Sequence, residues 1–141
     1  MVDDVADSVL AASLADTFAD DERRARQYLE HQQWSEGVGL LQRVADQQEV
    51  ILGHDHTNRF NNLCTLQWGY WMSGDKWKAE RIARQALEIC ERNHPEPDHP
   101  LTLSLMQKIA DNLLHQGRQV ERNIILEEIA RRKQRHDDGN H

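Results

Sequence analysis

The chain has 141 residues, 38% of them hydrophobic, and carries a formal net charge of −7 at pH 7. This length fits one domain with a buried core, and the acidic balance argues against nucleic-acid binding, which draws on a basic surface. The acidic start lacks the basic residues of a signal peptide, and no apolar run approaches the ~20 residues that a membrane helix needs. Because Cys64 and Cys90 fit no zinc or redox spacing, we expect reduced thiols in a cytoplasmic protein.

The N-terminal region reads as an acidic helix. Residues 1–22 hold seven acidic side chains and no basic one, and apolar residues recur there at helical spacing. We predict a helix from about Asp4 to Ala19 whose early acids complement the helix dipole, so that residues 1–19 cap the domain. An acidic docking tail is the alternative interpretation. The run Asp20-Asp21-Glu22 resembles a new helix start, although one continuous helix remains open.

Residues 20–52 resemble a degenerate helical hairpin. Tyr28 and Leu29 are expected to face inward, His31-Gln32-Gln33 replaces a glycine turn, and Trp34 opens the second helix. Gly37 lies inside that helix, where glycine costs about 1 kcal/mol relative to alanine. We therefore expect Gly37 to let a neighbouring helix come close.

Two clearer hairpins follow, and they repeat. Asp55-His56 recurs as Asp98-His99, and Gly74 recurs as Gly117, each 43 positions later. A fixed period of this length with two helices in each unit predicts a helical-hairpin solenoid. The expected core residues of these hairpins are Leu63, Leu66, Tyr70, Ala79, Ile82, Ala83, Ala86, Leu87, Ile89, Leu101, Leu105, Met106, Ile109, Ala110, Leu113, Val120, Ile124, Ile125, Ile129 and Ala130.

Proline and charge set the limits of the last hairpin. Pro95 and Pro97 interrupt the chain before it, and Asp98 is expected to cap the helix that follows. The final helix should end near Arg135, leaving residues 136–141 as a disordered tail. The sequence thus predicts an all-α helical-hairpin solenoid domain over residues 20–135, with two clear repeats, one degenerate repeat and an N-terminal helix.

These repeats resemble tetratricopeptide repeats (TPRs), and more narrowly the longer kinesin-light-chain type also found in NB-ARC/TPR proteins. The matching segments include Leu52-Gly53-His54-Asp55-His56, Trp77-Lys78-Ala79-Glu80, Asp98-His99-Pro100 and Gln116-Gly117. The chain departs from the pattern at Asn61-Asn62, which lie a turn earlier than the family's asparagine pair, at Gln67 in place of a small residue, and at Arg122 in place of alanine.

The resemblance implies that the first helix of each hairpin lines a concave groove that binds a peptide or a helix, in an adaptor or scaffold role. The groove residues would be Asn61, Thr65, Trp68, Trp71 and Met72, then Ser104, Lys108, Asp111 and His115, with Arg23 and Arg26 from the first repeat. Trp68 and Trp71 lie three apart on one helix face and would anchor a partner, unless they belong to the core. Lys108, Arg23 and Arg26 would receive an acidic peptide or a C-terminal carboxylate, unless they form a solvated helix face.

Neither a metal nor a cofactor is expected, although His54-Asp55-His56 and His94 with Asp98-His99 contain metal-ligand side chains. In the resembling family, Asp-His-Pro is simply the inter-repeat loop. No catalytic motif is present, so we expect no enzyme. The second hypothesis is a self-assembling, homodimeric solenoid fragment of a larger NB-ARC or kinesin-light-chain-like protein, since short solenoids leave apolar end faces that can pair.

Overall fold

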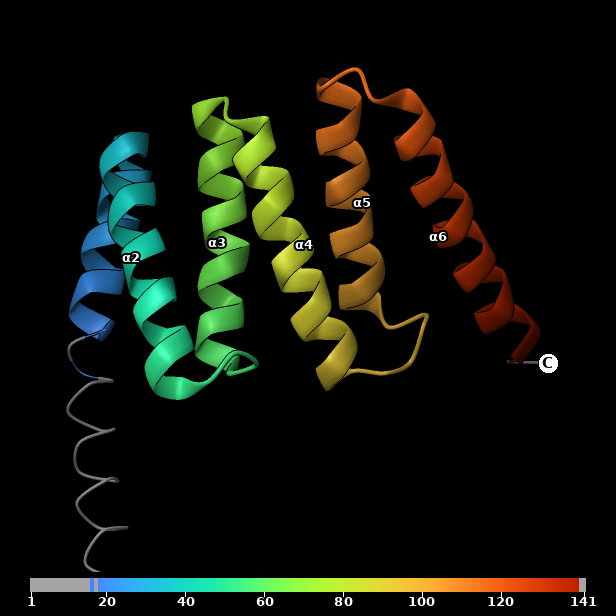
Figure 1. Cartoon of the computed structure of the whole chain (residues 1–141), viewed down its shortest axis with the longest axis horizontal. Helices are drawn as coiled ribbons and strands as arrows, with labels where there is room; N and C mark the ends of the chain where they lie inside the picture. The colour runs from blue at the N-terminus through green and yellow to red at the C-terminus, as the bar shows by residue number, and fades with distance from the viewer. Residues whose placement is uncertain (1–15, 17, 140–141) are drawn as a thin grey trace, which may run out of the picture. The chain divides into compact units, whose positions relative to one another are not determined.

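A computed structural model describes residue 16 and residues 18–139, and all regular structure in them is helical (Figure 1). A helix over residues 18–30 is followed by α2 (Trp34–Leu52), α3 (Thr57–Ser73), α4 (Lys76–Asn93), α5 (Pro100–His115) and α6 (Gln119–Gly139). The predicted all-α class and the order of the hairpin helices are confirmed. Most of the expected N-terminal cap, residues 1–19, lies outside the described residues.

The chain divides into two compact units, Met1–Asn62 and Leu63–His141, and the boundary falls within α3. Each unit has its own buried apolar residues. Those of the first unit are Phe18, Ala25, Leu29, Val38, Leu40, Leu41, Val44 and Ala45. Those of the second unit are Leu63, Leu66, Tyr70, Ala79, Ile82, Ala83, Ala86, Ile89, Cys90, Leu105, Met106, Ile109, Ala110, Leu113 and Ile129.

The three hairpin turns share one backbone geometry. In each, a residue one or two positions after the end of the first helix takes a positive φ, which is 60° at Gln32, 91° at Gly74 and 73° at Gly117. This left-handed conformation, with a hydrogen bond spanning five residues, is a common way to end a helix. Gln32 therefore occupies the glycine position of the first repeat. The spanning N–H to C=O bonds are Gln33 to Tyr28 (2.8 Å), Asp75 to Tyr70 (2.9 Å) and Arg118 to Leu113 (2.9 Å).

Gly37 lies where two helices of the first unit touch. A Cβ at this position would stand 2.6 Å from Leu29 Cδ2 and 3.3 Å from the Ala25 carbonyl oxygen. Any side chain at this position would force Leu29 to move, so the expected close approach is confirmed. The helix before α2 is already formed at Phe18 and passes through residues 19–22 without a break. The run Asp20-Asp21-Glu22 therefore lies within a helix and starts none.

Histidine, and not aspartate, caps the first helix of the third hairpin. His99 is the N-cap of α5, and its Nδ1 accepts a hydrogen bond from the Leu101 backbone N–H at 3.2 Å. His56 does the same before α3, where its Nδ1 accepts from the Asn58 N–H at 3.1 Å. The expectation that Asp98 caps α5 was wrong by one residue, because the helix begins at Pro100 and places His99 at the cap.

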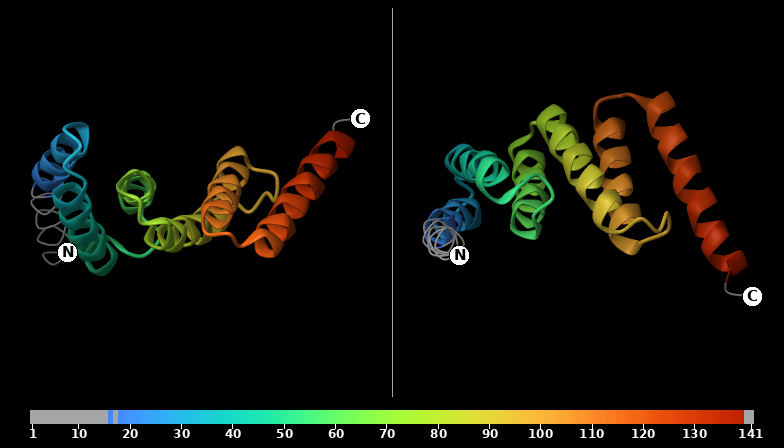
Figure 2. Two further views of the ribbon diagram at one scale, coloured as in Figure 1. Left: turned by 90° about the horizontal axis from the view of Figure 1, so that it is seen from above. Right: turned by 60° about the horizontal axis from the view of Figure 1, so that its bottom comes forward.

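The three helices α4, α5 and α6 of the second unit lie side by side (Figures 1 and 2). Ala79, Ala83 and Ala86 are fully buried on one face of α4, and such small residues let helices pack closely. One cluster joins the three helices and consists of Ala83, Ile109, Leu113, Leu87 and Ile125.

The last helix differs from the expected apolar stripe and from the expected end. Ile129 is buried, but Val120 is 76% exposed and Ile124 is 58% exposed. Among the described helices α6 makes its main contact with α5, so only one side of α6 is covered. The helix continues past Arg135 to Gly139, and no proline or glycine interrupts it before Gly139. Residues 140–141 lie outside the described residues.

Candidate partner-binding site

A small pocket in the second unit brings together side chains from α3 and α5. It has a volume of about 230 Å³ and is lined by Gln67, Trp68, Trp71, Lys108 and Asp111. We name it the α3–α5 pocket. Four of its five residues belong to the set predicted from the sequence. The helical spacing explains the grouping, because Trp68 and Trp71 lie three apart on α3, as do Lys108 and Asp111 on α5.

Trp71 is held on several sides. Its ring packs edge-on against His115, with 4.6 Å between ring centroids, and the Lys76 ammonium nitrogen lies 3.6 Å from the centre of a Trp71 ring. Lys76 Nζ also donates a hydrogen bond to the Trp71 carbonyl oxygen at 2.8 Å. A cation above a tryptophan face is attracted by the ring quadrupole, so Trp71 forms a fixed wall of the pocket.

Trp68 forms the open wall. It is 44% exposed, on the same helix that buries Leu66 and Tyr70 completely or nearly so. An exposed tryptophan that lines a cavity presents a large apolar area with little rotamer freedom to lose, which is typical of interface anchors. The alternative that Trp68 belongs to the packed core is not what the structure shows.

The polar side chains of the pocket differ in whether they already form hydrogen bonds with other residues of the chain. Asp111 accepts a hydrogen bond from Gln107 Nε2 at 3.0 Å. By contrast, the Lys108 ammonium and the Gln67 amide bond to no other side chain or backbone group in the described part of the chain. Lys108 is exposed, whereas Gln67 is only 5% exposed. The pocket therefore offers one cation and one amide beside two indole rings.

A buried carboxylate supports this region. Glu80 is 6% exposed and accepts hydrogen bonds from Arg84 (2.8 Å), Gln116 (3.0 Å) and Arg118 (2.6 Å). Gln116 Nε2 also donates to the carbonyl oxygen of Lys76 at 3.3 Å. This network ties the α5–α6 turn to the start of α4, next to the lysine that covers Trp71.

The remaining predicted groove residues do not line this pocket. Thr65 is half-buried on α3, and Asn61 is exposed on the part of α3 that belongs to the first unit. Arg23 and Arg26 are exposed on the helix of residues 18–30, where they pair with Asp20 at 2.8 Å and Glu22 at 3.6 Å. Met72, Ser104 and His115 are all exposed.

Gln67 is the pocket residue that the sequence prediction missed. The only sign of it was a polar side chain at a position where the resembling family has a small residue. Glutamine is usually found at the surface, whereas Gln67 is only 5% exposed beside two tryptophans, and a polar residue at an expected packing position is the signal that could have placed it in the site.

The histidines of the loops serve as caps and stacking partners. His94 and His99 stack with 4.1 Å between ring centroids, and His54 Nδ1 lies 3.1 Å from a Glu49 carboxylate oxygen. In the described residues, no three or more histidine, cysteine or acidic side chains gather where a metal ion could be held. None of the helices described combines the length and apolar character needed to cross a bilayer.

The sequence comparison defines the family. Residues 21–92, about half of the chain, match the tetratricopeptide repeat family, and the chain belongs to this family. No curated protein matches the sequence at a significant level.

Solved structures show the same fold. The nearly identical TPR-like repeats of a candidate kinesin light chain from Podosopora anserina superpose with a TM-score of 0.69 at 24% identity, covering 84% of this chain and 56% of that one. A variant of the same repeats gives a TM-score of 0.68 at 23% identity, covering 86% and 57%. The chain thus spans a little over half the length of these relatives, and the expected kinesin-light-chain-like repeat fold is confirmed.

Tetratricopeptide repeats generally mediate protein–protein interactions, and their fold is typical of scaffolds that carry out no catalysis. Stacked hairpins present extended surfaces made of exposed helix faces. The class of function that follows is protein binding.

Proposed function

We propose that this chain is an adaptor or scaffold module that binds a peptide or a helix of a partner protein at the α3–α5 pocket. One observation carries the proposal: an exposed Trp68, a fixed Trp71 and an unpaired Lys108 surround one cavity in the described part of the chain. Such a set combines apolar burial with a charge that can be matched, as binding hot spots do.

The pocket is sized for one side chain of a partner. Its volume of about 230 Å³ is below the roughly 300–1,000 Å³ of sites that enclose small molecules. A partner side chain entering it would bury apolar area against the indole rings of Trp68 and Trp71. The Gln67 amide would then hydrogen-bond the polar part of the partner's backbone or side chain.

Lys108 gives the partner its preferred charge. A carboxylate beside the pocket would form a charge-assisted hydrogen bond with the Lys108 ammonium, whereas a partner cation would be repelled. Asp111 also lines the pocket, and its carboxylate would repel an acidic group placed next to it. The preference for an acidic group therefore applies only to the part of the pocket beside Lys108. We infer an acidic group on the partner close to the side chain that fills the pocket.

The proposed module works in a reducing compartment and acts by binding alone, with no cofactor and no catalytic step. Cys64 and Cys90 are free thiols, which fits a reducing compartment such as the cytoplasm. Residues 1–19 are proposed to cap the N-terminal end of the repeat domain.

A selection from a displayed peptide library tests this function and reveals the chemistry that the pocket prefers. The wild-type chain is compared with a Trp68→Ala/Lys108→Ala double variant and with a Trp77→Ala/Arg81→Ala double variant as the matched control. Trp77 is 65% exposed and Arg81 is exposed, both on α4, so the control removes an aromatic ring and a cation outside the pocket. Each variant is first checked for wild-type helicity.

We expect wild type and control to enrich the same acidic peptides and the pocket variant to lose them. Equal enrichment by all three proteins would place binding elsewhere on the chain and overturn the proposal. The same comparison in a pull-down from cell extract then identifies the natural partner.

A further inference from the structure

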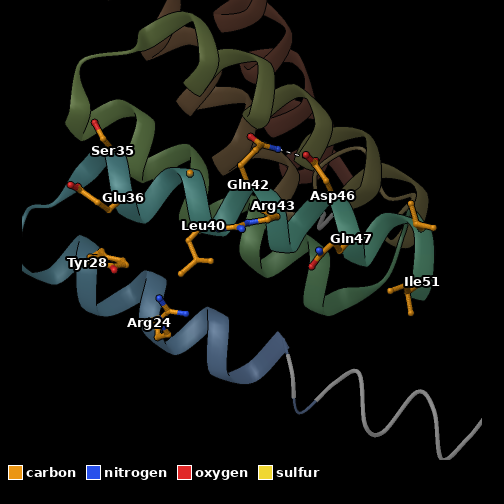
Figure 3. Close-up of a pocket in the computed structure, with 12 residues that line it drawn as sticks. Arg24, Tyr28, Ser35, Glu36, Leu40, Gln42, Arg43, Asp46, Gln47 and Ile51 are labelled. Atoms are coloured by element: carbon orange, nitrogen blue, oxygen red, sulfur yellow. Dashed lines mark hydrogen bonds between the residues drawn. The ribbon is translucent and has the colours of Figure 1, made fainter.

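The first unit has a larger depression of its own. It has a volume of about 890 Å³ and is lined by residues of the helix over 18–30 and of α2 (Figure 3). Tyr28 and Leu40 face its centre, and Ile51 stands at its far end. The lining residues Val50 and Ile51 are 86% and 44% exposed. The proposed peptide site makes no use of this surface.

The exposed face of α2 carries charge in a regular order. Glu36, Gly39, Arg43, Asp46 and Val50 are all exposed and recur at intervals of three or four, so they form one stripe along the helix. Glu36 and Arg43 make no hydrogen bond or ion pair with other residues in the described part of the chain. The stripe thus holds an exposed anion and an exposed cation two helical turns apart, and neither forms an ion pair within the described residues.

Gly39 lies midway between these two charges. A glycine inside a helix costs roughly 0.5–1 kcal/mol relative to alanine. At Gly37 the packing explains the glycine, because a Cβ there would lie 2.6 Å from Leu29 Cδ2. At Gly39 no such explanation exists, because a Cβ there would meet no atom of the described chain within 4 Å. The missing side chain at Gly39 serves no contact among the described residues, and it leaves a flat spot on an exposed helix.

The charges around Gly39 are complementary to those of a second α2 helix that runs in the opposite direction, because Glu36 and Arg43 lie on either side of Gly39. If a second α2 crosses the first in the antiparallel direction near Gly39, Glu36 of each chain faces Arg43 of the other. Each charge then lies about 5 Å along the axis from the crossing point, given a rise of 1.5 Å per residue. Such a contact is the same patch on both subunits, which is how two-fold dimers are built.

We propose that two copies of this chain associate through α2, crossing at Gly39, with reciprocal Glu36–Arg43 ion pairs on either side. The absence of a side chain at Gly39 lets the two helix axes approach closely. The depression is lined by two cations and two anions, which are Arg24, Arg43, Glu36 and Asp46, so these side chains carry no net charge. The whole chain, by contrast, has a formal net charge of −7. Association through this patch therefore avoids the repulsion that two acidic surfaces would meet elsewhere.

Charge reversal tests both the partner and the register. The full chain is studied by sedimentation equilibrium as wild type, Glu36→Arg, Arg43→Glu and a 1:1 mixture of the two variants. The controls Glu88→Arg and Arg81→Glu make the same changes in net charge at exposed positions of α4. Circular dichroism confirms that every variant is folded.

We expect a concentration-dependent dimer for wild type and both controls. Each single reversal should weaken dimerisation by about tenfold or more, because it places like charges opposite each other twice. The mixture should recover the dimer, since the arginine introduced at position 36 of one chain then faces the glutamate introduced at position 43 of the other. The double variant Glu36→Arg/Arg43→Glu should recover the dimer as well.

Other results would contradict the inference. A monomeric wild type at all concentrations would exclude the dimer. A dimer that survives both single reversals would place the contact on another surface, and single variants that fail to recover on mixing would refute the antiparallel register. Replacement of Gly39 by Leu provides an independent check, because bulk at the crossing point should abolish the dimer while leaving the monomer folded.

Discussion

Arg118 Nη1 donates a hydrogen bond to Glu80 Oε1 at 2.6 Å, and this contact joins the turn after α5 to α4 across 38 positions of sequence. Arg118 also lies over the Trp77 ring, 4.9 Å from its centroid. Glu80 is buried, so its charge is stable only because Arg84, Gln116 and Arg118 all donate to it. The second unit is therefore stabilised by this buried hydrogen-bond network as well as by its apolar core.

The stability of the second unit should depend on pH through this carboxylate. Burial acts to raise the pKa of Glu80, but hydrogen bonds from Arg84 and Gln116 and the charges of Arg84 and Arg118 outweigh it, so that the pKa lies below its ordinary value of 4.5. The pKa values of Glu121 and Glu128 are lowered in the same way, chiefly by hydrogen bonds from Arg118 and from Arg132. The unfolded chain then binds more protons than the folded one near pH 4.

We therefore expect full stability above the ordinary glutamate pKa of 4.5 and a progressive loss as the pH falls through the folded-state pKa values. Denaturant titrations from neutral to acidic pH measure this loss. Glu80→Gln should cost about 1–2 kcal/mol at neutral pH and should make the acid-induced loss shallower. A Glu80→Gln profile parallel to that of wild type would show that this carboxylate does not carry the dependence.

Gln32→Gly should stabilise the protein. Gln32 is a non-glycine residue with a φ of 60°, and a side chain in this conformation costs about 1 kcal/mol. Glycine also loosens the unfolded chain, so we expect a net gain of only about 0.5 kcal/mol in the free energy of unfolding. The control Gln33→Gly, at a φ of −87°, should gain nothing, and equal effects of the two would refute the explanation.

The two glycines of α2 should respond in opposite ways to alanine. Gly37→Ala forces a methyl group to within 2.6 Å of the buried Leu29, and overpacking of this kind costs about 1–3 kcal/mol. Gly39→Ala adds a methyl group in open space and should raise the stability of the monomer by up to about 1 kcal/mol. Thermal unfolding at low protein concentration distinguishes them, and a destabilised Gly39→Ala monomer would contradict the account of the free helix face.

The two tryptophans of the pocket should differ in structural importance. Trp71→Ala removes ring contacts with Lys76 and His115 and should lower the free energy of unfolding by about 2 kcal/mol. Trp68 is 44% exposed, and Trp68→Ala should cost less than about 1 kcal/mol. Urea titrations of the two variants give both numbers. A larger loss for Trp68→Ala would assign that ring to the fold and remove the basis for calling it an anchor.

The repeat pattern was readable because turn and core each have a local signature. Gly74 and Gly117 mark left-handed helix ends, and their 43-residue period carried back reaches His31, one residue before Gln32, which has the positive φ in the first repeat. Ala79, Ala83 and Ala86 mark a tightly packed helix face. These features depend on residues close in sequence, which is why periodicity alone reveals them.

Features that depend on distant residues were not readable. Asn62 is buried, and its Nδ2 donates a compensating hydrogen bond to Gln48 Oε1 at 2.9 Å. Arg59 is 3% exposed, although arginine is usually found at the surface. Val120 and Ile124 share the helical spacing of core residues, but no described helix covers their side of α6. Periodicity shows which face of a helix is apolar, and it does not show whether a neighbour is present.

The grouping of four predicted residues in one pocket follows from the same local patterns. Trp68 and Trp71, and likewise Lys108 and Asp111, each occupy one helix face, and the repeat fold brings α3 and α5 together around the pocket. Arg23, Arg26 and Asn61 belong to the first unit. The role of all these residues in partner binding stays a prediction.

The measurement that tests the central claim most directly is the affinity of a selected acidic peptide for wild type, Lys108→Ala and the matched Arg81→Ala, by calorimetry at low and high salt. We predict that Lys108→Ala weakens binding by about tenfold or more and reduces its salt dependence, while Arg81→Ala binds as wild type does. Equal affinities for Lys108→Ala and Arg81→Ala would contradict the assignment of the α3–α5 pocket as the partner-binding site.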